Sequence, residues 1–424
     1  MDEDANPTMD LDTTTSEILL AATNHDLDTL RPLLRNGSAN VRDEDTGTTP
    51  LHAALLACED ADTSVHEDGT DGDIGDAISS KALQEDGAVK TIRYLFENGA
   101  IWNDLNANNE TPGCLALRLG LKQAYQVIVD AGVRAELLLN RLDEFEVLDD
   151  GDEETEDAER VAEEDGDVVS QQNGDTNGAV AKAQAISADE APRLVESNGE
   201  VKADVNSARY LASELTFGGD RLLDADDNGV MMSWETDLMR QSVEALVDGE
   251  GKRVLNVGHG MGIIDGIFQE KKPVEHHIIE AHPAVLERMN QQGWNEKQGV
   301  HIREGRWQDL VADMAAEGKM FDAIYFDTFA EEYKDLREFF SEHVISLLSP
   351  DGRFGFFNGL GADRQVCYDV YDKLVEMDLF EAGLETDWKE LDISDLDKAG
   401  EWEGVRRKYW ALPTYRLPTC KFVG

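Results

Sequence analysis

Apolar positions divide this chain into two patterned regions, separated by a stretch that has almost none. After about residue 207, short apolar runs alternate with helical patterns. Strands are expected at Arg253–Val257, His276–Ala281, Val300–Glu304, Phe321–Asp327 and Gly352–Asn358, and helices include Trp234–Val247, Ala284–Gln292 and Leu336–Leu348. Strands that alternate with helices predict an α/β fold with a doubly wound, mostly parallel sheet.

The first region contains an internal repeat. Gly37 and Gly99 each lie twelve residues before a Thr-Pro pair, and Gly132 follows Gly99 by 33 residues. The T-P-L-H-x-A motif that begins at Thr49 and this period resemble ankyrin repeats. We expect two to three helix pairs over residues 14–142, a small stack that leans on the domain behind it and offers a protein-docking surface. A disordered tail is expected at 1–13, and an acidic insertion at about 59–87.

Residues 143–206 are rich in acidic and small polar side chains. Such a composition cannot bury enough apolar surface to offset chain entropy, so we expect a disordered acidic linker. A simple tether is favoured, and an electrostatic lure for a basic substrate is the alternative. At the other end, residues 408–422 suggest an antiparallel hairpin in which Pro413 and Pro418 occupy an edge strand or the turn.

The charge balance limits the partners. The formal net charge is −51, from 89 acidic and 38 basic residues, which disfavours nucleic acid and anionic membranes and favours a basic protein. The four cysteines are scattered and show no metal-ligand spacing, so we expect free thiols and no metal site. With no apolar segment of membrane length, we expect a soluble protein of the cytoplasm and nucleus.

A glycine turn follows the first expected strand of the second region. Gly258, Gly260 and Gly262 alternate there, and Glu280 ends the next apolar run eighteen residues later. A dinucleotide fingerprint would require glycine at position 263, where the chain has Ile263. The pattern favours S-adenosylmethionine, with Glu280 accepting the ribose hydroxyls.

Polar or glycine residues end each expected strand. In a doubly wound sheet, ligands bind at the carboxyl ends of the strands. The ends carry Gly258–Gly262, Glu280, Gly305–Trp307, Asp327 and Asn358. Five candidate contacts at five successive ends indicate a shared ligand site.

Upstream of these strands, Met231, Glu235 and Met239 have the spacing of one helix face. Such a stripe usually packs in a core, but a carboxylate within it requires a cationic partner. A substrate guanidinium would be such a partner.

A family resemblance follows from these motifs together. The segments Met231–Met239, Val254–Met261, Ile278–Glu280, Phe321–Thr328 and Tyr409–Pro413 resemble guanidinoacetate N-methyltransferase, and the preceding repeats make the whole chain similar to the fungal type IV protein arginine methyltransferases. The resemblance implies a Rossmann-like class I methyltransferase domain over 207–424. It also implies methyl transfer from S-adenosylmethionine to the δ (internal) nitrogen of a protein arginine, in substrates that are ribosomal proteins.

The resemblance also assigns roles by position. Glu235 and Asp327 are the expected catalytic residues, and Met231, Glu235 and Asn358 the expected substrate contacts. Expected cofactor contacts are Tyr210, Phe217, Met239, Gly258, His259, Gly260, Met261, Gly262, Ile263, Ile264, Glu280, Ala281, His282, Arg306, Trp307 and Asp327.

Two departures from the family pattern bear on these roles. Asn256 stands where such enzymes usually carry an acid at the end of the first strand, which puts a contact to the methionine ammonium in question. After Asn358 the chain lacks the Thr-Ser pair that would hold a free carboxylate, which favours a peptide substrate. The alternatives are a small-molecule guanidino methyltransferase and a catalytically inactive ankyrin scaffold.

Overall fold

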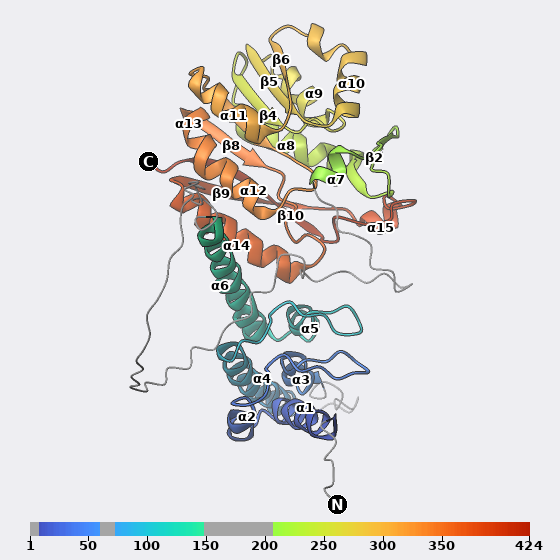
Figure 1. Ribbon diagram of the computed structural model, residues 1–424, viewed down its shortest axis with the longest axis vertical. Helices are drawn as coiled ribbons and strands as arrows, with labels where there is room; N and C mark the ends of the chain where they lie inside the picture. The colour runs from blue at the N-terminus through green and yellow to red at the C-terminus, as the bar shows by residue number, and fades with distance from the viewer. Residues whose placement is uncertain (1–7, 60–72, 148–206) are drawn as a thin grey trace, which may run out of the picture. The chain divides into compact units, whose positions relative to one another are not determined.

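The computed structural model describes residues 8–59, 73–147 and 207–424 (Figure 1). The described residues up to Leu137 and from Ser207 onward belong to one compact unit. The expected tail at 1–7, part of the acidic insertion at 60–72, and the expected linker over 148–206 lie outside the described residues.

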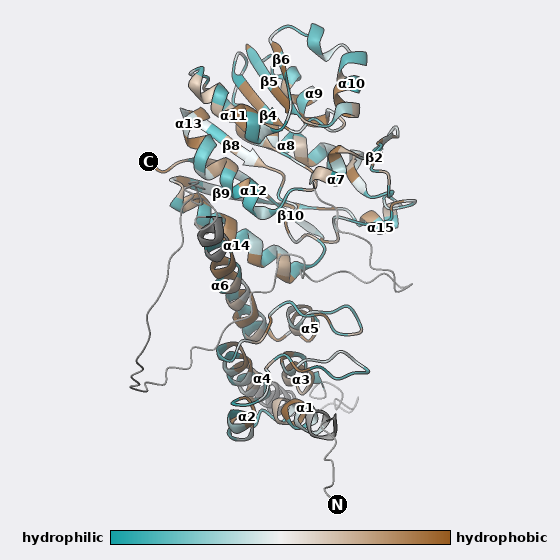
Figure 2. Ribbon diagram, viewed as in Figure 1, coloured by the Kyte–Doolittle hydropathy of each residue, from teal (hydrophilic) through white to brown (hydrophobic). Residues whose placement is uncertain are grey.

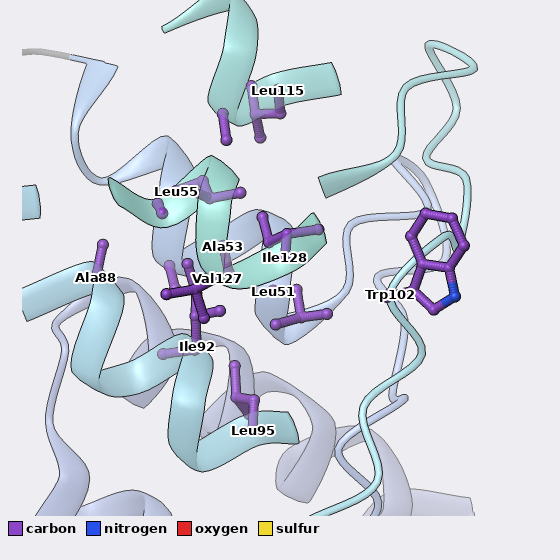
Figure 3. Close-up of a cluster of buried hydrophobic side chains, with 14 of the residues drawn as sticks. Leu51, Ala53, Leu55, Ala88, Ile92, Leu95, Trp102, Leu115, Val127 and Ile128 are labelled. Carbon is purple, nitrogen blue, oxygen red and sulfur yellow. The ribbon is translucent and has the colours of Figure 1, made fainter. Parts of the chain in front are cut away.

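The N-terminal region is helical, as the repeat pattern predicted. Its helices are α1 (Thr8–Thr23), α2 (Leu27–Leu33), α3 (Pro50–Leu56), α4 (Asp73–Glu97), α5 (Pro112–Arg118) and α6 (Lys122–Val147). Leu51, Leu55, Ile92 and Leu115 are among the side chains that meet in one apolar core (Figure 3).

Helices extend across three of the expected boundaries of this region. Helix α1 begins at Thr8 inside the expected tail, α4 begins at Asp73 inside the expected insertion, and α6 runs to Val147. The reason in α4 is cooperative helix growth. Ala88, Ile92 and Leu95 anchor its second half in the core, and extending a formed helix costs far less than nucleating one.

The Thr-Pro motifs have a visible structural purpose. The Thr49 hydroxyl lies 2.8 Å from Nδ1 of His52, and Nε2 of that ring lies 3.0 Å from the Glu110 carbonyl oxygen. Burial lowers the pKa of His52, so the ring is neutral and bridges one helix pair to the loop before the next. The Thr111 hydroxyl accepts a hydrogen bond from Cys114 N–H and caps α5.

Helix α14 (Gln365–Glu381) completes the core of this small stack. Its Val366 and Val370 belong to the same buried cluster as the repeat helices. The Tyr125 hydroxyl donates to Asp369 of α14 at 2.5 Å. The repeat helices therefore pack against α14 of the domain that follows, as a short stack requires.

Within the described residues, the second region contains a seven-stranded sheet in the order β6-β5-β4-β7-β8-β10-β9 (Figure 1). Its strands are β4 (Arg253–Val257), β5 (Glu275–Glu280), β6 (Val300–Glu304), β7 (Phe321–Phe326), β8 (Leu348–Phe356), β9 (Leu384–Asp392) and β10 (Thr414–Phe422). Strands β4 to β8 pair in parallel and β10 runs antiparallel to both neighbours. The chain is a class I methyltransferase-like α/β fold, as expected.

Helices connect the parallel strands. They are α9 (Ile263–Glu270), α10 (Pro283–Gln291), α11 (Trp307–Ala316), α12 (Tyr333–Glu338), the π-helix η5 (Phe339–Val344) and α13 (Ile345–Leu347), and α8 (Thr236–Leu246) precedes β4. Strand β4 is largely apolar while the helices carry polar faces (Figure 2), because helices bury a parallel sheet on both sides. All five expected strands are present, with ends that differ by up to four residues.

A smaller sheet precedes these elements. The segment begins with α7 (Ser207–Leu211) and continues into β1 (Thr216–Phe217), β2 (Arg221–Leu223) and β3 (Gly229–Met232), which form an antiparallel sheet. The short 3-10 helix η3 (Ser233–Glu235) then leads into α8. The expected single helix face was therefore wrong, because Met231 lies on β3, Glu235 on η3 and Met239 on α8.

The expected C-terminal hairpin was also wrong. Residues 414–422 form one long strand, β10, which pairs along its length with β9 and lies between β9 and β8. Pro418 therefore sits in an interior strand. It is accommodated because the register of β10 with β8 is limited to Cys420 opposite Phe354, so no continuous ladder on that side needs its missing N–H.

In the part of the chain that the structure describes, no helix combines the length and apolarity needed to cross a bilayer. Cys58, Cys114, Cys367 and Cys420 are all unbridged, and Cys58 and Cys420 are buried.

Candidate active site

A cavity opens at the carboxyl ends of β4, β5 and β7, where the order of the strands reverses around β4. This is the position at which open α/β sheets bind their ligands. Ten of the expected site residues line it: Tyr210, Met231, Glu235, Gly258, Gly260, Glu280, Ala281, Arg306, Trp307 and Asp327. Their side chains come from segments spread over more than a hundred residues, so the fold gathers them.

The turn after β4 approaches its neighbours too closely for a side chain. Gly258 has φ +94°, and a Cβ there would lie 1.9 Å from the carbonyl oxygen of Asp327. At Gly260 a Cβ would lie 2.8 Å from Cε of Met231. Glycine thus lets β4 end directly against the residue that closes β7, and it leaves the turn's backbone facing the cavity.

Glu280 occupies the end of β5 and is 7% exposed. Its carboxylate accepts hydrogen bonds from the backbone N–H groups of His259 at 2.9 Å, Ala281 at 2.8 Å and His282 at 2.7 Å. These bonds, with a longer one from Gly260 N–H at 3.4 Å, fix both carboxylate oxygens at the cavity wall. The site therefore fits the ribose of S-adenosylmethionine, whose two hydroxyls require an acceptor there.

A second wall is built from the turns after β6 and β7. The Trp307 indole N–H donates to Glu331 at 3.0 Å, and Thr328 Oγ1 donates to the same carboxylate at 2.7 Å. Burial raises the pKa of Glu331, against the effect of these hydrogen bonds. The flat indole beside an acceptor suits a purine. The sequence pattern did not identify Glu331, which lies five residues beyond the end of β7.

The cavity lining also includes two acids, Glu235 and Asp327. Glu235 is 2% exposed, and it accepts hydrogen bonds from Met232 N–H at 2.9 Å and from the Tyr409 hydroxyl. Asp327 is part-buried, and its Oδ2 is shielded from solvent without a hydrogen-bond partner among the described residues. An orphaned carboxylate oxygen of this kind indicates a missing donor.

The two acids influence each other's protonation. Burial, and then the nearby charge of Asp327, raises the pKa of Glu235 to about 8. Burial, and then the charge of Asp265, raises the pKa of Asp327 to about 7. Carboxyl groups held partly protonated at neutral pH favour a bound cation, which would restore both charges.

Tyr409 is a site residue that the sequence analysis missed. It belongs to a motif that carried the resemblance, yet nothing in its spacing placed it near Glu235, from which it is separated by 174 positions. Phe329, Phe357 and Leu360 also line the cavity. They follow strand ends by one to four residues, so a wider window around each end would have included them.

Nine expected contacts do not line this cavity: Phe217, Met239, His259, Met261, Gly262, Ile263, Ile264, His282 and Asn358. Met239 and Ile264 are buried in an apolar cluster. The His282 ring caps α10 by accepting from Ala284 N–H at 3.1 Å. The Asn358 amide donates to Asp372 at 2.8 Å. The side chains of Met239, Ile264, His282 and Asn358 are thus buried outside the cavity lining.

Asn256 also faces away from the cavity. It is fully buried, and its amide donates to the Gly258 carbonyl oxygen at 2.8 Å and to Asp265 at 2.9 Å. Asn256, which stands where such enzymes usually carry an acid, therefore supports the glycine turn from behind. Asn256 is not among the residues that line the cavity.

The chain is similar to known proteins over nearly its whole length. Residues 206–400 match the family model of guanidinoacetate N-methyltransferase. The chain is 52% identical over 420 residues to protein arginine N-methyltransferase 2 of Aspergillus fumigatus, with 97% of each chain aligned. It is 52% identical over 427 residues to the Emericella nidulans protein of that name, covering 99% of this chain and 100% of the relative. The Yarrowia lipolytica protein of that name is 38% identical over 420 residues, covering 89% of this chain and 84% of the relative. The chain belongs to the protein arginine N-methyltransferase 2 family.

Proposed function

We propose that this chain, an S-adenosylmethionine-dependent protein arginine methyltransferase, adds one methyl group to the δ nitrogen of an arginine in a basic protein. The observation that carries the proposal is the pair of interacting acids in the cavity, the buried Glu235 and Asp327 with its shielded, unpartnered Oδ2. A planar cation is the ligand that such a pair stabilises best.

The chemistry of the guanidinium favours its internal nitrogen. Each terminal nitrogen carries two N–H groups, and a carboxylate accepts such pairs side by side. Two carboxylates that bind the terminal nitrogens leave the δ nitrogen as the one free to approach the methyl donor. In this proposal Glu235 and Asp327 select the methylated nitrogen by occupying the other two.

When bound, S-adenosylmethionine supplies an electrophilic methyl group on a positively charged sulfur. The residues of the chain then have two tasks. Holding the δ nitrogen in line with the methyl group contributes roughly 7–11 kcal/mol. Accepting the proton that leaves this nitrogen is the second task, and Asp327, with its unpartnered Oδ2, is the better placed of the two acids.

The cavity favours a protein-bound arginine over a free guanidino acid. Among the described residues that line it, five are acidic and one, Arg306, is a cation. The acids are Glu235, Glu280, Asp327, Glu331 and Glu332. A free guanidino acid would bring its own carboxylate into this negative field. Gly359 and Leu360, at the wall where a carboxylate-binding pair would stand, offer no side-chain donor.

The partner is proposed to be a basic protein, and a ribosomal protein is the expected class. The net charge of −51 would attract such a partner, and the repeats before the catalytic region would supply a docking surface. The proposed places of action are the cytoplasm and nucleus, where ribosomal proteins are made and assembled.

Labelled-methyl transfer tests the proposal. The enzyme is incubated with labelled S-adenosylmethionine and either a basic ribosomal protein fraction or free guanidinoacetate, and modified arginines are fragmented in a mass spectrometer. Label on protein arginine at the δ nitrogen is expected. Label on a terminal nitrogen, or comparable labelling of guanidinoacetate, would contradict the proposal.

A further inference from the structure

A buried polar cluster lies directly behind the glycine turn. Asp265, in the first turn of α9, is completely buried. Its carboxylate accepts hydrogen bonds from His259 Nδ1 at 2.6 Å, from the Asn256 amide at 2.9 Å and from His276 Nε2 at 2.9 Å. One carboxylate thus joins the end of β4, the glycine turn, α9 and β5. None of these four side chains is among those that line the cavity.

The hydrogen bonds identify Asp265 as an anion. The Gln269 amide nitrogen lies 2.8 Å from Nδ1 of His276, so that ring accepts there and donates its Nε2 proton to Asp265. Burial by itself would raise the pKa of Asp265, but the bonds from His259 and His276 outweigh burial and lower it to about 2. The nearby Lys297 ammonium lies over the Trp294 ring, which in turn packs against His259.

This anion controls the shape of the turn. The His259 ring is held by Asp265 and packs under Gly262, where a Cβ would lie 2.7 Å from it. The backbone N–H of His259 donates to the Glu280 carboxylate at 2.9 Å. Asn256 holds the turn at its start through the Gly258 carbonyl oxygen. The side of the turn opposite the cavity is therefore tied to one fixed negative charge.

The same charge reaches the reacting end of the cavity. Asp265 contributes to the raised pKa of Asp327, so its field extends across the turn that separates the two carboxylates. A methyl donor seated against that turn carries a positive sulfur, whereas its spent product carries a neutral one. A fixed negative charge behind the turn stabilises the first and leaves the second nearly unaffected.

We propose that Asp265 is a positioning residue for the methyl donor. The buried charge of Asp265 takes the place of the acid that such enzymes usually carry where this chain has Asn256, and it makes the site prefer the charged donor over the neutral product. The carboxylate lies on α9 instead of at the end of β4, and Asn256 and His259 connect it to the turn. This role is independent of which arginine nitrogen is methylated.

Calorimetry with two ligands separates this role from simple structural support. The Asp265→Asn variant keeps the shape of the side chain and removes its charge. We expect its Kd for S-adenosylmethionine to rise about tenfold, and its Kd for S-adenosylhomocysteine to change less than threefold, since a charge interaction near a partly buried site is worth roughly one factor of ten. Equal weakening of both ligands would mean a structural role only and would overturn the proposal.

Two further variants keep the test decisive. The exchange Asn256→Asp with Asp265→Asn returns the charge to the end of β4, and we expect it to restore the parent preference for the donor. If the exchanged protein does not prefer S-adenosylmethionine over S-adenosylhomocysteine, the proposal is overturned. This result decides the test even if Asp265→Asn alone does not fold. Asp378→Asn is the matched control, because Asp378 is 6% exposed, is hydrogen-bonded to Tyr333 and lies on α14 outside the cavity lining. This control should leave both Kd values unchanged.

Discussion

The carboxylates at the cofactor end of the site and those at its substrate end have opposite hydrogen-bonding surroundings. At the cofactor end, Glu280 in the cavity wall and Asp265, buried behind the glycine turn, each receive several hydrogen bonds from nearby backbone and side chains. At the substrate end, Asp327 Oδ2 has no partner in the described part of the chain, and the charges of both acids there are disfavoured. The first end is organised before any ligand arrives, whereas the second requires the ligand's charge to complete it.

Neutralising the substrate-end acids should have the largest effect. Glu235→Gln and Asp327→Asn are each expected to lower kcat by a factor of about 100 or more, because the guanidinium loses a charged partner and the departing proton loses its acceptor. Both variants should bind S-adenosylmethionine with near-parent affinity by calorimetry. Near-parent turnover in both would remove the distinction between the two ends.

Neutralising Glu280 should have a different effect. Glu280→Gln is expected to raise the Kd for S-adenosylmethionine by about tenfold to a hundredfold, because hydrogen bonds to a charged group contribute about 1.5–3 kcal/mol. The turnover at saturating cofactor should stay within a few-fold of the parent value. A fall in kcat with unchanged cofactor affinity would place Glu280 in the chemistry and contradict its assignment.

Removing the Tyr409 hydroxyl should have a smaller effect. Its hydrogen bond favours the ionised form of Glu235, so Tyr409→Phe should raise the pKa of that carboxyl further. The acid limb of the kcat/KM profile is expected to move to higher pH, with a loss of roughly threefold to tenfold at neutral pH. The matched variant Tyr415→Phe removes a buried hydroxyl that bonds Asn358 N–H outside the cavity lining, and its profile should not move.

The smallest expected effect is on stability. The folded-state pKa values of Glu235 and Asp327 are raised, so the native protein holds protons that the unfolded chain releases. Between pH 4 and pH 8 these groups therefore cost stability as pH rises. A Glu235→Gln and Asp327→Asn double variant should unfold a few degrees above the parent at pH 8.5, with a smaller difference at pH 5. The same difference at both pH values would contradict the raised pKa values.

The sequence predicted the sheet more successfully than the site's details. All five expected strands exist, and the apolar runs of β4 and β7 are of the kind that one buried parallel strand reveals by itself. Strand β9 and the small sheet of β1, β2 and β3 were missed, since short or exposed strands carry little apolar pattern. The position of β10 depends on pairing with β9, which no local pattern encodes.

Within the site, residues at strand ends were found and those brought in by tertiary structure were not. Glu280 and Asp327 follow apolar runs, so their places were readable from the chain. Tyr409 and Glu331 depend on distant contacts. His259 lies in the right turn, but its side chain faces inward to Asp265, because a buried carboxylate requires donors.

The central claim is that Glu235 and Asp327 wait in partly protonated form for a guanidinium. Calorimetry of an arginine-containing basic peptide binding to enzyme saturated with S-adenosylhomocysteine tests this directly, when repeated at pH 7 in buffers of different ionisation enthalpy. The account predicts release of about one proton per peptide bound, because the arriving cation favours both charged carboxylates. The Glu235→Gln and Asp327→Asn double variant should release none. Binding by the parent enzyme without proton release would contradict the account.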